Sequence, residues 1–222
     1  MYEEKINYPE ITEFLNNNLS PLIGDAAVLE KELRENEHLP IVRPSAARFL
    51  QFLCLLIKPR KILEIGTCVG FSAILMKNAC PNAEITTIDR YDYMINRAKE
   101  NFARFDKEGK ITLLEGQAAE ILPTLKEKYD FIFLDAAKGQ YPAFLPYLLE
   151  RLSDNGVLLV DDVLFDGLVA ESSRSSRRDM TIVKRLRSFI SEITNNEELY
   201  SALTPIGDGM ILVQKRGENK WH

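Results

Sequence analysis

The chain has 222 residues, 45% of them hydrophobic and 27% charged, and its formal net charge is -5 at pH 7. This length and composition suit one globular α/β domain and exclude a disordered or fibrous chain. The mild acidity argues against wholesale coating of nucleic acid but leaves room for a local basic face.

The first part of the chain, residues 1–58, is predicted to be helical. Helices are expected over 8–18, 21–37 and 44–57, with Pro9, Pro21 and Pro44 in their first turns. From residue 59 onward, short apolar runs alternate with helical patterns. The expected strands are 61–65, 84–89, 110–115, 129–135 and 156–161, and the expected helices lie near 71–79, 92–106, 117–125 and 140–152. This alternation predicts a mostly parallel sheet with helices on both faces.

The C-terminal part has a different pattern. A helix over 179–195 is expected to precede strands at 199–204 and 209–215, and the turn residues 205–209 between these strands predict an antiparallel hairpin at the sheet edge. The polar stretch 166–178 is predicted to be a mobile loop. We expect one domain, 1–222, comprising the helical part, a Rossmann-like core over 59–216 and a tail over 217–222.

Cysteine and histidine content restricts the chemistry. The three cysteines form no CxxC pair, so neither a disulfide framework nor a zinc site is expected. A reducing, cytoplasmic location is expected instead. The only histidines are His38 and His222, which makes a Ser-His-Asp hydrolase hard to build. No apolar stretch reaches the length of a membrane span, and the acidic N-terminus lacks a signal-peptide core.

Three aspartates follow two of the predicted strands directly. Asp135 ends the run 129–134, and Asp161 and Asp162 end the run 157–160. Ligands of open α/β sheets bind beyond the carboxyl ends of the strands, so these acids are expected around one point. Clustered carboxylates repel each other unless a cation lies among them, and Mg²⁺ prefers such oxygen ligands. Lys138 adds a titratable amine beside Asp135. Read singly, each aspartate would more often be a helix cap or a turn residue.

A glycine loop follows the strand 61–65. Gly66 and Gly70 are expected to permit a tight turn and close approach of a ligand, and Asp89 ends the next strand, where an acid accepts ribose hydroxyls in nucleotide-type sites. The GxGxxG spacing is absent, which favours a nucleoside cofactor without phosphates over NAD. A glycine turn that only packs helix on strand is the alternative.

These motifs together resemble the metal-dependent class I O-methyltransferases that use S-adenosylmethionine, including the catechol and caffeoyl-CoA enzymes. The resemblance runs from about Leu39 to Arg216. It is carried by the segments 40–42, 64–67, 70–72, 135–138, 161–164 with Gly167, and 207–209, together with Asp89. It implies a Rossmann-like class I methyltransferase fold: a mostly parallel seven-stranded sheet with an antiparallel C-terminal edge hairpin, helices on both faces and additional N-terminal helices.

The resemblance also implies roles for individual residues. Asp135, Asp161 and Asp162 would bind Mg²⁺, or alternatively Mn²⁺, and Asp135 and Lys138 would be the catalytic residues. The cofactor-binding residues would be Val42, Glu64, Gly66, Ser72, Asp89, Ala118 and Asp135, with Glu64 near the methionine amino group. The family also commonly forms homodimers, so a homodimer is expected.

Two departures from the family pattern bear on the substrate. Asp162 stands where animal and plant enzymes usually carry Asn, and Ala137 replaces the bulky aromatic of the animal catechol enzymes. The motif 135–141 most resembles the bacterial branch that methylates 5-hydroxyuridine at the tRNA wobble position. We therefore expect tRNA as substrate, with a catechol-like phenol, or binding of S-adenosylmethionine without turnover, as alternatives.

A basic cluster in this acidic chain bears on the same question. Its members are Arg174, Arg177, Arg178, Lys184, Arg185 and Arg187. It is expected to bind RNA phosphates near the site, the alternative being an ordinary solvated surface.

Overall fold

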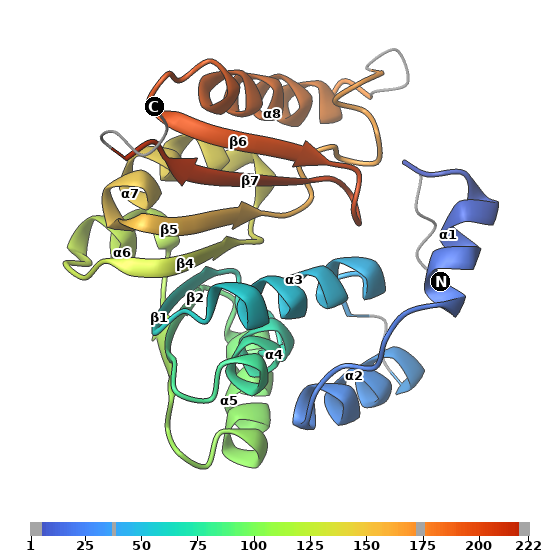
Figure 1. Ribbon diagram of the computed structural model, residues 1–222, viewed down its shortest axis with the longest axis vertical. Coiled ribbons are helices and arrows are strands. Elements are labelled where there is room, and N and C mark those ends of the chain that lie inside the picture. Colours follow the sequence, from blue (N-terminus) through green and yellow to red (C-terminus); the bar gives the residue numbers. More distant parts are fainter. Residues whose placement is uncertain (1–5, 37–38, 172–175, 218–222) are drawn as a thin grey trace.

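Seven strands form a single sheet in the order β3-β2-β1-β4-β5-β7-β6 in the computed structural model, which describes residues 6–36, 39–171 and 176–217 (Figure 1). The strands are β1 (Lys61–Ile65), β2 (Glu84–Asp89), β3 (Ile111–Glu115), β4 (Tyr129–Leu134), β5 (Leu152–Val160), β6 (Leu199–Thr204) and β7 (Met210–Lys215). β1 to β5 pair in parallel, whereas β7 pairs antiparallel with both β5 and β6. The predicted sheet and its edge hairpin are confirmed.

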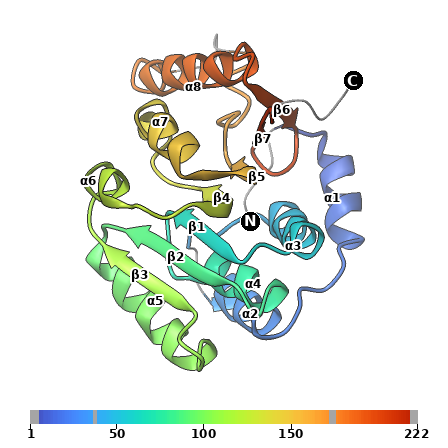
Figure 2. The same cartoon turned by 60° about the vertical axis from the view of Figure 1, so that its left-hand side comes forward.

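Helices cover both faces of this sheet (Figure 2). They are α1 (Pro9–Asn17), α2 (Asp25–Asn36), α3 (Pro44–Ile57), α4 (Phe71–Ala79), α5 (Asp92–Phe105), α6 (Ala118–Ile121), α7 (Tyr141–Arg151) and α8 (Asp179–Thr194), with short 3-10 turns η1 (Leu122–Thr124) and η2 (Lys138–Gln140). α2 to α5 lie on one face and α6 to α8 on the other. Successive strand residues point to opposite faces, so Phe131 and Phe133 join the core beneath α3 and α4, while Ile132 and Leu134 join the core beneath α7 and α8.

Three predicted elements differ from those observed by more than two residues at one end. α2 begins at Asp25 rather than at 21, because Gly24 has a left-handed backbone (φ 60°) that ends the preceding segment. The helix predicted over 117–125 is split into α6 and η1, since Pro123 has no N–H to continue the α-helical bonds. β5 starts at Leu152 rather than at 156, because Leu152 already pairs with Tyr129 ahead of a register shift.

The N-terminal helices are held mainly through α2 and α3. α1 buries none of its residues, whereas α3 buries Ala46, Ala47 and Leu50 in the core. The Asn7 side chain donates to Pro205 O at 3.2 Å, which places Asn7 beside the turn between β6 and β7. Within the described ranges, no helix is both long enough and apolar enough to span a membrane.

Candidate functional site

A cavity of about 430 Å³ opens beyond the carboxyl ends of β1, β2, β4 and β5. Parallel strands end at the same edge of a sheet, so the loops that follow them meet there. The cavity is lined by residues from 40–43, 65–68, 71–72, 88–91, 116–118, 135–138 and 161–162, with Met94, Gln140 and Phe144. A volume of this size suits a small organic cofactor.

The cavity brings together most of the predicted cofactor-binding residues. Val42, Gly66, Ser72, Asp89, Ala118 and Asp135 all line it. Glu64 does not: its side chain is fully buried, and its Oε2 accepts a hydrogen bond of 2.5 Å from Thr87 Oγ1. Glu64 Oε1 has no hydrogen-bond partner in the described part of the chain. Burial raises the pKa of Glu64 to about 8, against the opposing effects of the Ser72 and Thr87 side chains.

Asp89 is fixed by the backbone around it. One carboxylate oxygen accepts from Cys68 N at 2.8 Å, and the other accepts from Arg90 N at 2.7 Å and Tyr91 N at 3.0 Å. Asp89 therefore orders the glycine loop and at the same time lines the cavity. The two oxygens have about four lone-pair sites, so capacity remains for a ligand hydroxyl.

The two glycines of this loop make room for the protein itself. A Cβ on Gly66, whose φ is 105°, would lie 1.8 Å from Asp135 O, and one on Gly70 would lie 2.5 Å from the Phe102 ring. Gly66 thus lets the loop after β1 reach the end of β4, where Asp135 N donates to Ile65 O at 2.9 Å. The missing Cβ at these two positions makes room for other parts of the chain, and Gly66 also lines the cavity.

The three predicted metal ligands line the same cavity. Asp161 is 2% exposed, and its Oδ1 accepts from Asp162 N at 2.7 Å. Burial, followed by the charge of Asp162, raises the pKa of Asp135 to about 7. Burial and the charges of Asp135 and Asp162 raise the pKa of Asp161 well above its usual value. Carboxylates that line one cavity repel each other when all are ionised, which agrees with these raised pKa values.

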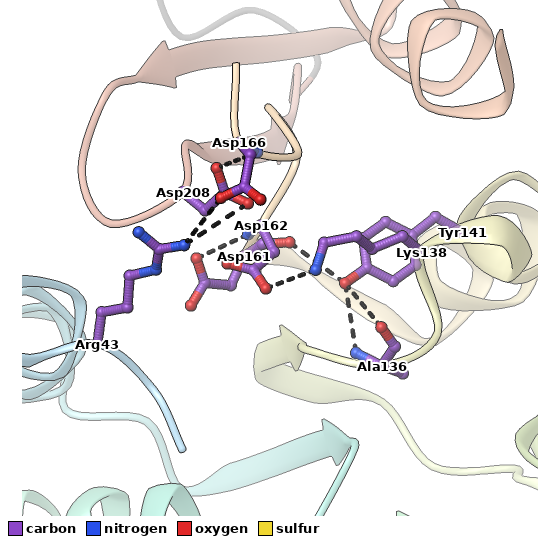
Figure 3. A network of polar contacts seen from close by, with 8 residues as sticks. All are labelled: Arg43, Ala136, Lys138, Tyr141, Asp161, Asp162, Asp166 and Asp208. Carbon is purple, nitrogen blue, oxygen red and sulfur yellow. Dashed lines mark hydrogen bonds and ion pairs between the residues drawn. The ribbon is translucent and has the colours of Figure 1, made fainter. Parts of the chain in front are cut away.

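Lys138 offsets part of this negative charge. Its Nζ lies 2.7 Å from Asp162 Oδ2 (Figure 3). Burial favours the neutral amine, but the charge and hydrogen bond of Asp162 outweigh it and raise the pKa of Lys138 above its usual value. Among the residues placed by the structure, no three acidic, histidine or cysteine side chains are arranged as a set of metal ligands. The Asp162 carboxylate is turned toward the lysine instead.

Tyr141 connects the two strand ends that carry the acids. Its ring is fully buried, and its hydroxyl lies 3.2 Å from Ala136 O, 3.2 Å from Asp161 O and 3.3 Å from Ala136 N (Figure 3). Tyr141 therefore belongs to the core beneath α7 and α8. The bridging role has no local sequence signal, because both partners are backbone atoms of other elements.

The described members of the predicted basic cluster are all exposed, and two of them also hold loops of the fold in place. Arg187 Nε donates to Val169 O at 2.7 Å, and Arg185 Nη1 donates to Gly139 O at 3.0 Å, so both brace loops of the fold. Arg177, Arg178 and Lys184 are exposed. Residues 172–175 of the predicted mobile loop, Arg174 among them, lie outside the described residues, and residues 166–170 of that loop form turns.

Comparison with known proteins places these features in a family context. Residues 26–216 match the family model described as O-methyltransferase. The O-methyltransferase ankF of Aspergillus thermomutatus is 30% identical over 98% of this chain and 100% of its own length. A catechol O-methyltransferase of Niastella koreensis is 33% identical over 74% of this chain and 79% of its own. The SAH-bound methyltransferase PaMTH1 of Podospora anserina superposes with a TM-score of 0.83 at 25% identity, covering 94% of each chain.

Proposed function

Because this chain belongs to the O-methyltransferase family and has the class I methyltransferase fold, we propose that it transfers a methyl group from S-adenosylmethionine to a hydroxyl oxygen with the help of a divalent cation. The observation that carries this proposal is the single cavity that joins a nucleoside-type pocket at Asp89 to three carboxylates at the ends of β4 and β5. Methyl transfer requires the two reactants to be held in line, which such a cavity provides.

The cofactor half of the cavity supports S-adenosylmethionine. Asp89 would accept the ribose hydroxyls, and the loop containing Gly66 would lie along the nucleoside. Glu64 would act from beneath the floor, where its unpartnered Oε1 can favour the cationic amino group. Val42, Ser72 and Ala118 would line the remainder. The cofactor would supply an electrophilic methyl group on its sulfonium.

The acidic half supports a hard divalent cation. Asp135, Asp161 and Asp162 would hold Mg²⁺, or alternatively Mn²⁺, because oxygen ligands of this charge suit such ions and because their mutual repulsion favours a cation among them. The ion would act as a Lewis acid that lowers the pKa of the acceptor hydroxyl. To serve as a ligand, the Asp162 carboxylate must exchange its contact with Lys138 for one with the cation.

Lys138 is the catalytic residue proposed to act on the acceptor oxygen. In the protein without ligands it is an ammonium paired with Asp162. Release of that carboxylate, with a cation nearby, would favour the neutral amine that accepts the acceptor proton. If the lysine stays protonated, it stabilises the developing oxyanion instead.

For the acceptor, we propose 5-hydroxyuridine at the wobble position of a tRNA. Its 5-hydroxyl and 4-carbonyl oxygens form an adjacent pair that one cation can hold, and the small Ala137 leaves the mouth wide. The exposed Arg177, Arg178 and Lys184 support contact with RNA phosphates. A catechol-like small molecule has an equivalent oxygen pair, and the catechol O-methyltransferase relative favours it as the second candidate.

The acceptor can be decided by one experiment with the full chain. Purified protein, S-adenosylmethionine and Mg²⁺ are incubated in parallel with hydroxyuridine-containing tRNA and with a catechol, and products are identified by mass spectrometry. A methylated nucleoside that disappears with EDTA supports the proposal. Methylation of the catechol alone supports the second candidate, and full activity in EDTA refutes the metal.

The RNA surface is tested by charge reversal. Arg177→Glu with Arg178→Glu should weaken tRNA binding and reduce its dependence on salt. The control is Lys107→Glu with Lys110→Glu, two lysines just before β3 at the opposite end of the sheet. This pair changes the net charge equally and should leave tRNA binding nearly unchanged.

We also propose that the chain forms a homodimer. Large apolar side chains are exposed on α1 and α3, among them Phe14, Phe52 and Leu56 at 66%, 60% and 67%. Exposed large apolar side chains gathered on two helices are typical of protein interfaces. Light scattering should give twice the mass of the 25.4 kDa chain, and Phe52→Glu with Leu56→Glu should give the monomer.

A further inference from the structure

The loop that follows β5 has an unusual backbone. Asp162, Phe165 and Asp166 have φ angles of 59°, 48° and 53°. These angles lie in the left-handed region, which residues other than glycine rarely adopt. Asp162 is one of the three acids of the site. Such a conformation persists only where the surroundings hold it in place.

The turn between β6 and β7 provides this support. Val163 N donates to Gly209 O at 3.0 Å, and Leu164 N donates to Asp208 O at 2.9 Å. The Asp208 side chain adds a third bond, since its Oδ1 accepts from Asp166 N at 2.7 Å. The packing is close, because a Cβ on Gly209 would lie 2.3 Å from Leu164 Cγ.

Arg43 reaches the same point from the opposite wall of the cavity (Figure 3). It precedes α3 and lines the cavity beside Val42. Its Nη2 lies 3.6 Å from Asp166 Oδ1 and 4.0 Å from Asp208 Oδ2. The Asp208 side chain is only 4% exposed, and a carboxylate buried to this degree needs a countercharge.

From these contacts we propose that Asp208 and Arg43 are positioning residues of the acceptor half of the site. Asp208 holds the loop 162–166 through Asp166 N and thereby fixes where the Asp162 carboxylate lies. Arg43 balances the buried charge of Asp208 and ties the loop to the wall that lines the cofactor half. Neither residue touches the reacting atoms. The expected effect on Mn²⁺ affinity rests on the proposed function, whereas the expected effect on amide hydrogen exchange does not.

The role of Asp208 is tested by two substitutions in the full chain. Asp208→Ala removes the acceptor for Asp166 N, whereas Asp208→Asn keeps an acceptor oxygen and removes the charge. Mn²⁺ affinity is measured by calorimetry without substrate, and amide hydrogen exchange is followed over 161–169. Asp208→Ala should weaken Mn²⁺ binding about tenfold or more, the usual cost of losing a group that orients a ligand, and should speed exchange at Val163, Leu164 and Asp166. Asp208→Asn should retain most of both properties.

The role of Arg43 is tested against a matched arginine, Arg48, on the helix that Arg43 precedes. Arg48 is 20% exposed against 16% for Arg43, and it pairs with Glu30 on the side away from the cavity. Arg43→Met should weaken Mn²⁺ binding and speed exchange over 161–169, Arg43→Lys should restore part of both, and Arg48→Met should change neither.

The outcomes separate this inference from the function on which it draws. If the unmodified chain binds no Mn²⁺ while Asp208→Ala still speeds exchange over 161–169, the metal proposal fails and the positioning role stands. If the unmodified chain binds Mn²⁺ and both Asp208→Ala and Arg43→Met leave affinity and exchange unchanged, the positioning role is refuted. Equal losses from Arg43→Met and Arg48→Met also refute it, because they would reflect general destabilisation.

Discussion

Tyr141→Phe is the most direct test of how the two acid-bearing strand ends are joined. The substitution removes one buried hydroxyl that lies within 3.3 Å of Ala136 N and 3.2 Å of both Ala136 O and Asp161 O. The ring keeps its packing, including the tilted contact with Phe189 at 5.7 Å between centroids. The effect therefore isolates the hydrogen bonds of the hydroxyl from the burial of the side chain.

The expected cost follows from those bonds. The hydroxyl donates one bond and accepts one, and its loss also leaves the half-buried Ala136 N–H without this acceptor. Together these effects should lower the free energy of unfolding by about 2 to 3 kcal/mol. For a chain of this length the melting temperature should fall by about 4 to 12 °C. Because the bridge joins the ends of β4 and β5, Mn²⁺ affinity should fall as well.

Urea denaturation and Mn²⁺ calorimetry check both effects against Tyr147→Phe. Tyr147 lies on the same helix but is 36% exposed, so the control should change stability by less than about 0.5 kcal/mol. Equal stability of the two variants would refute the bridging role of Tyr141. A loss of stability with unchanged Mn²⁺ affinity would restrict that role to folding.

Three further outcomes are expected. Gly66→Ala should lower the free energy of unfolding by about 3 kcal/mol through backbone strain and contact with Asp135 O. Gly109→Ala, also at positive φ but in open space, should lower it by about 1 kcal/mol. Similar losses for the two variants in urea denaturation would contradict the steric reasoning. The folded pKa of Asp135 is raised from 3.8 to about 7, so the stability that its protonated form contributes without metal is present below the usual pKa and is lost as the pH rises toward 7. Mn²⁺ affinity should rise over that interval, and a flat calorimetric profile would contradict this. Lys138→Ala should lower kcat more than the affinity for S-adenosylmethionine, and equal losses in stopped-flow and binding assays would remove its catalytic role.

Local sequence patterns are enough to predict the alternation of strands and helices and the positions of the acids. Apolar runs buried on both faces read as parallel strands, and an aspartate directly after such a run must lie at the carboxyl edge of the sheet. Asp89, Asp135 and Asp161 were placed correctly for this reason: each position depends only on its own strand and on the edge that all parallel strands share.

The tertiary structure decided which side chains surround those acids. The contacts of Asp208 with Asp166 and Arg43 join segments separated by 42 and 165 positions along the chain, and no local pattern encodes such a pairing. Glu64 was expected within the cofactor pocket but lies beneath it, because alternation along β1 turns its side chain into the core between sheet and helices. Arg185 and Arg187 are exposed members of the predicted basic cluster, and their hydrogen bonds to backbone carbonyls of distant loops are visible only in the folded chain. Local periodicity fixes which face a residue takes, whereas its partner depends on how loops from separate strands pack together.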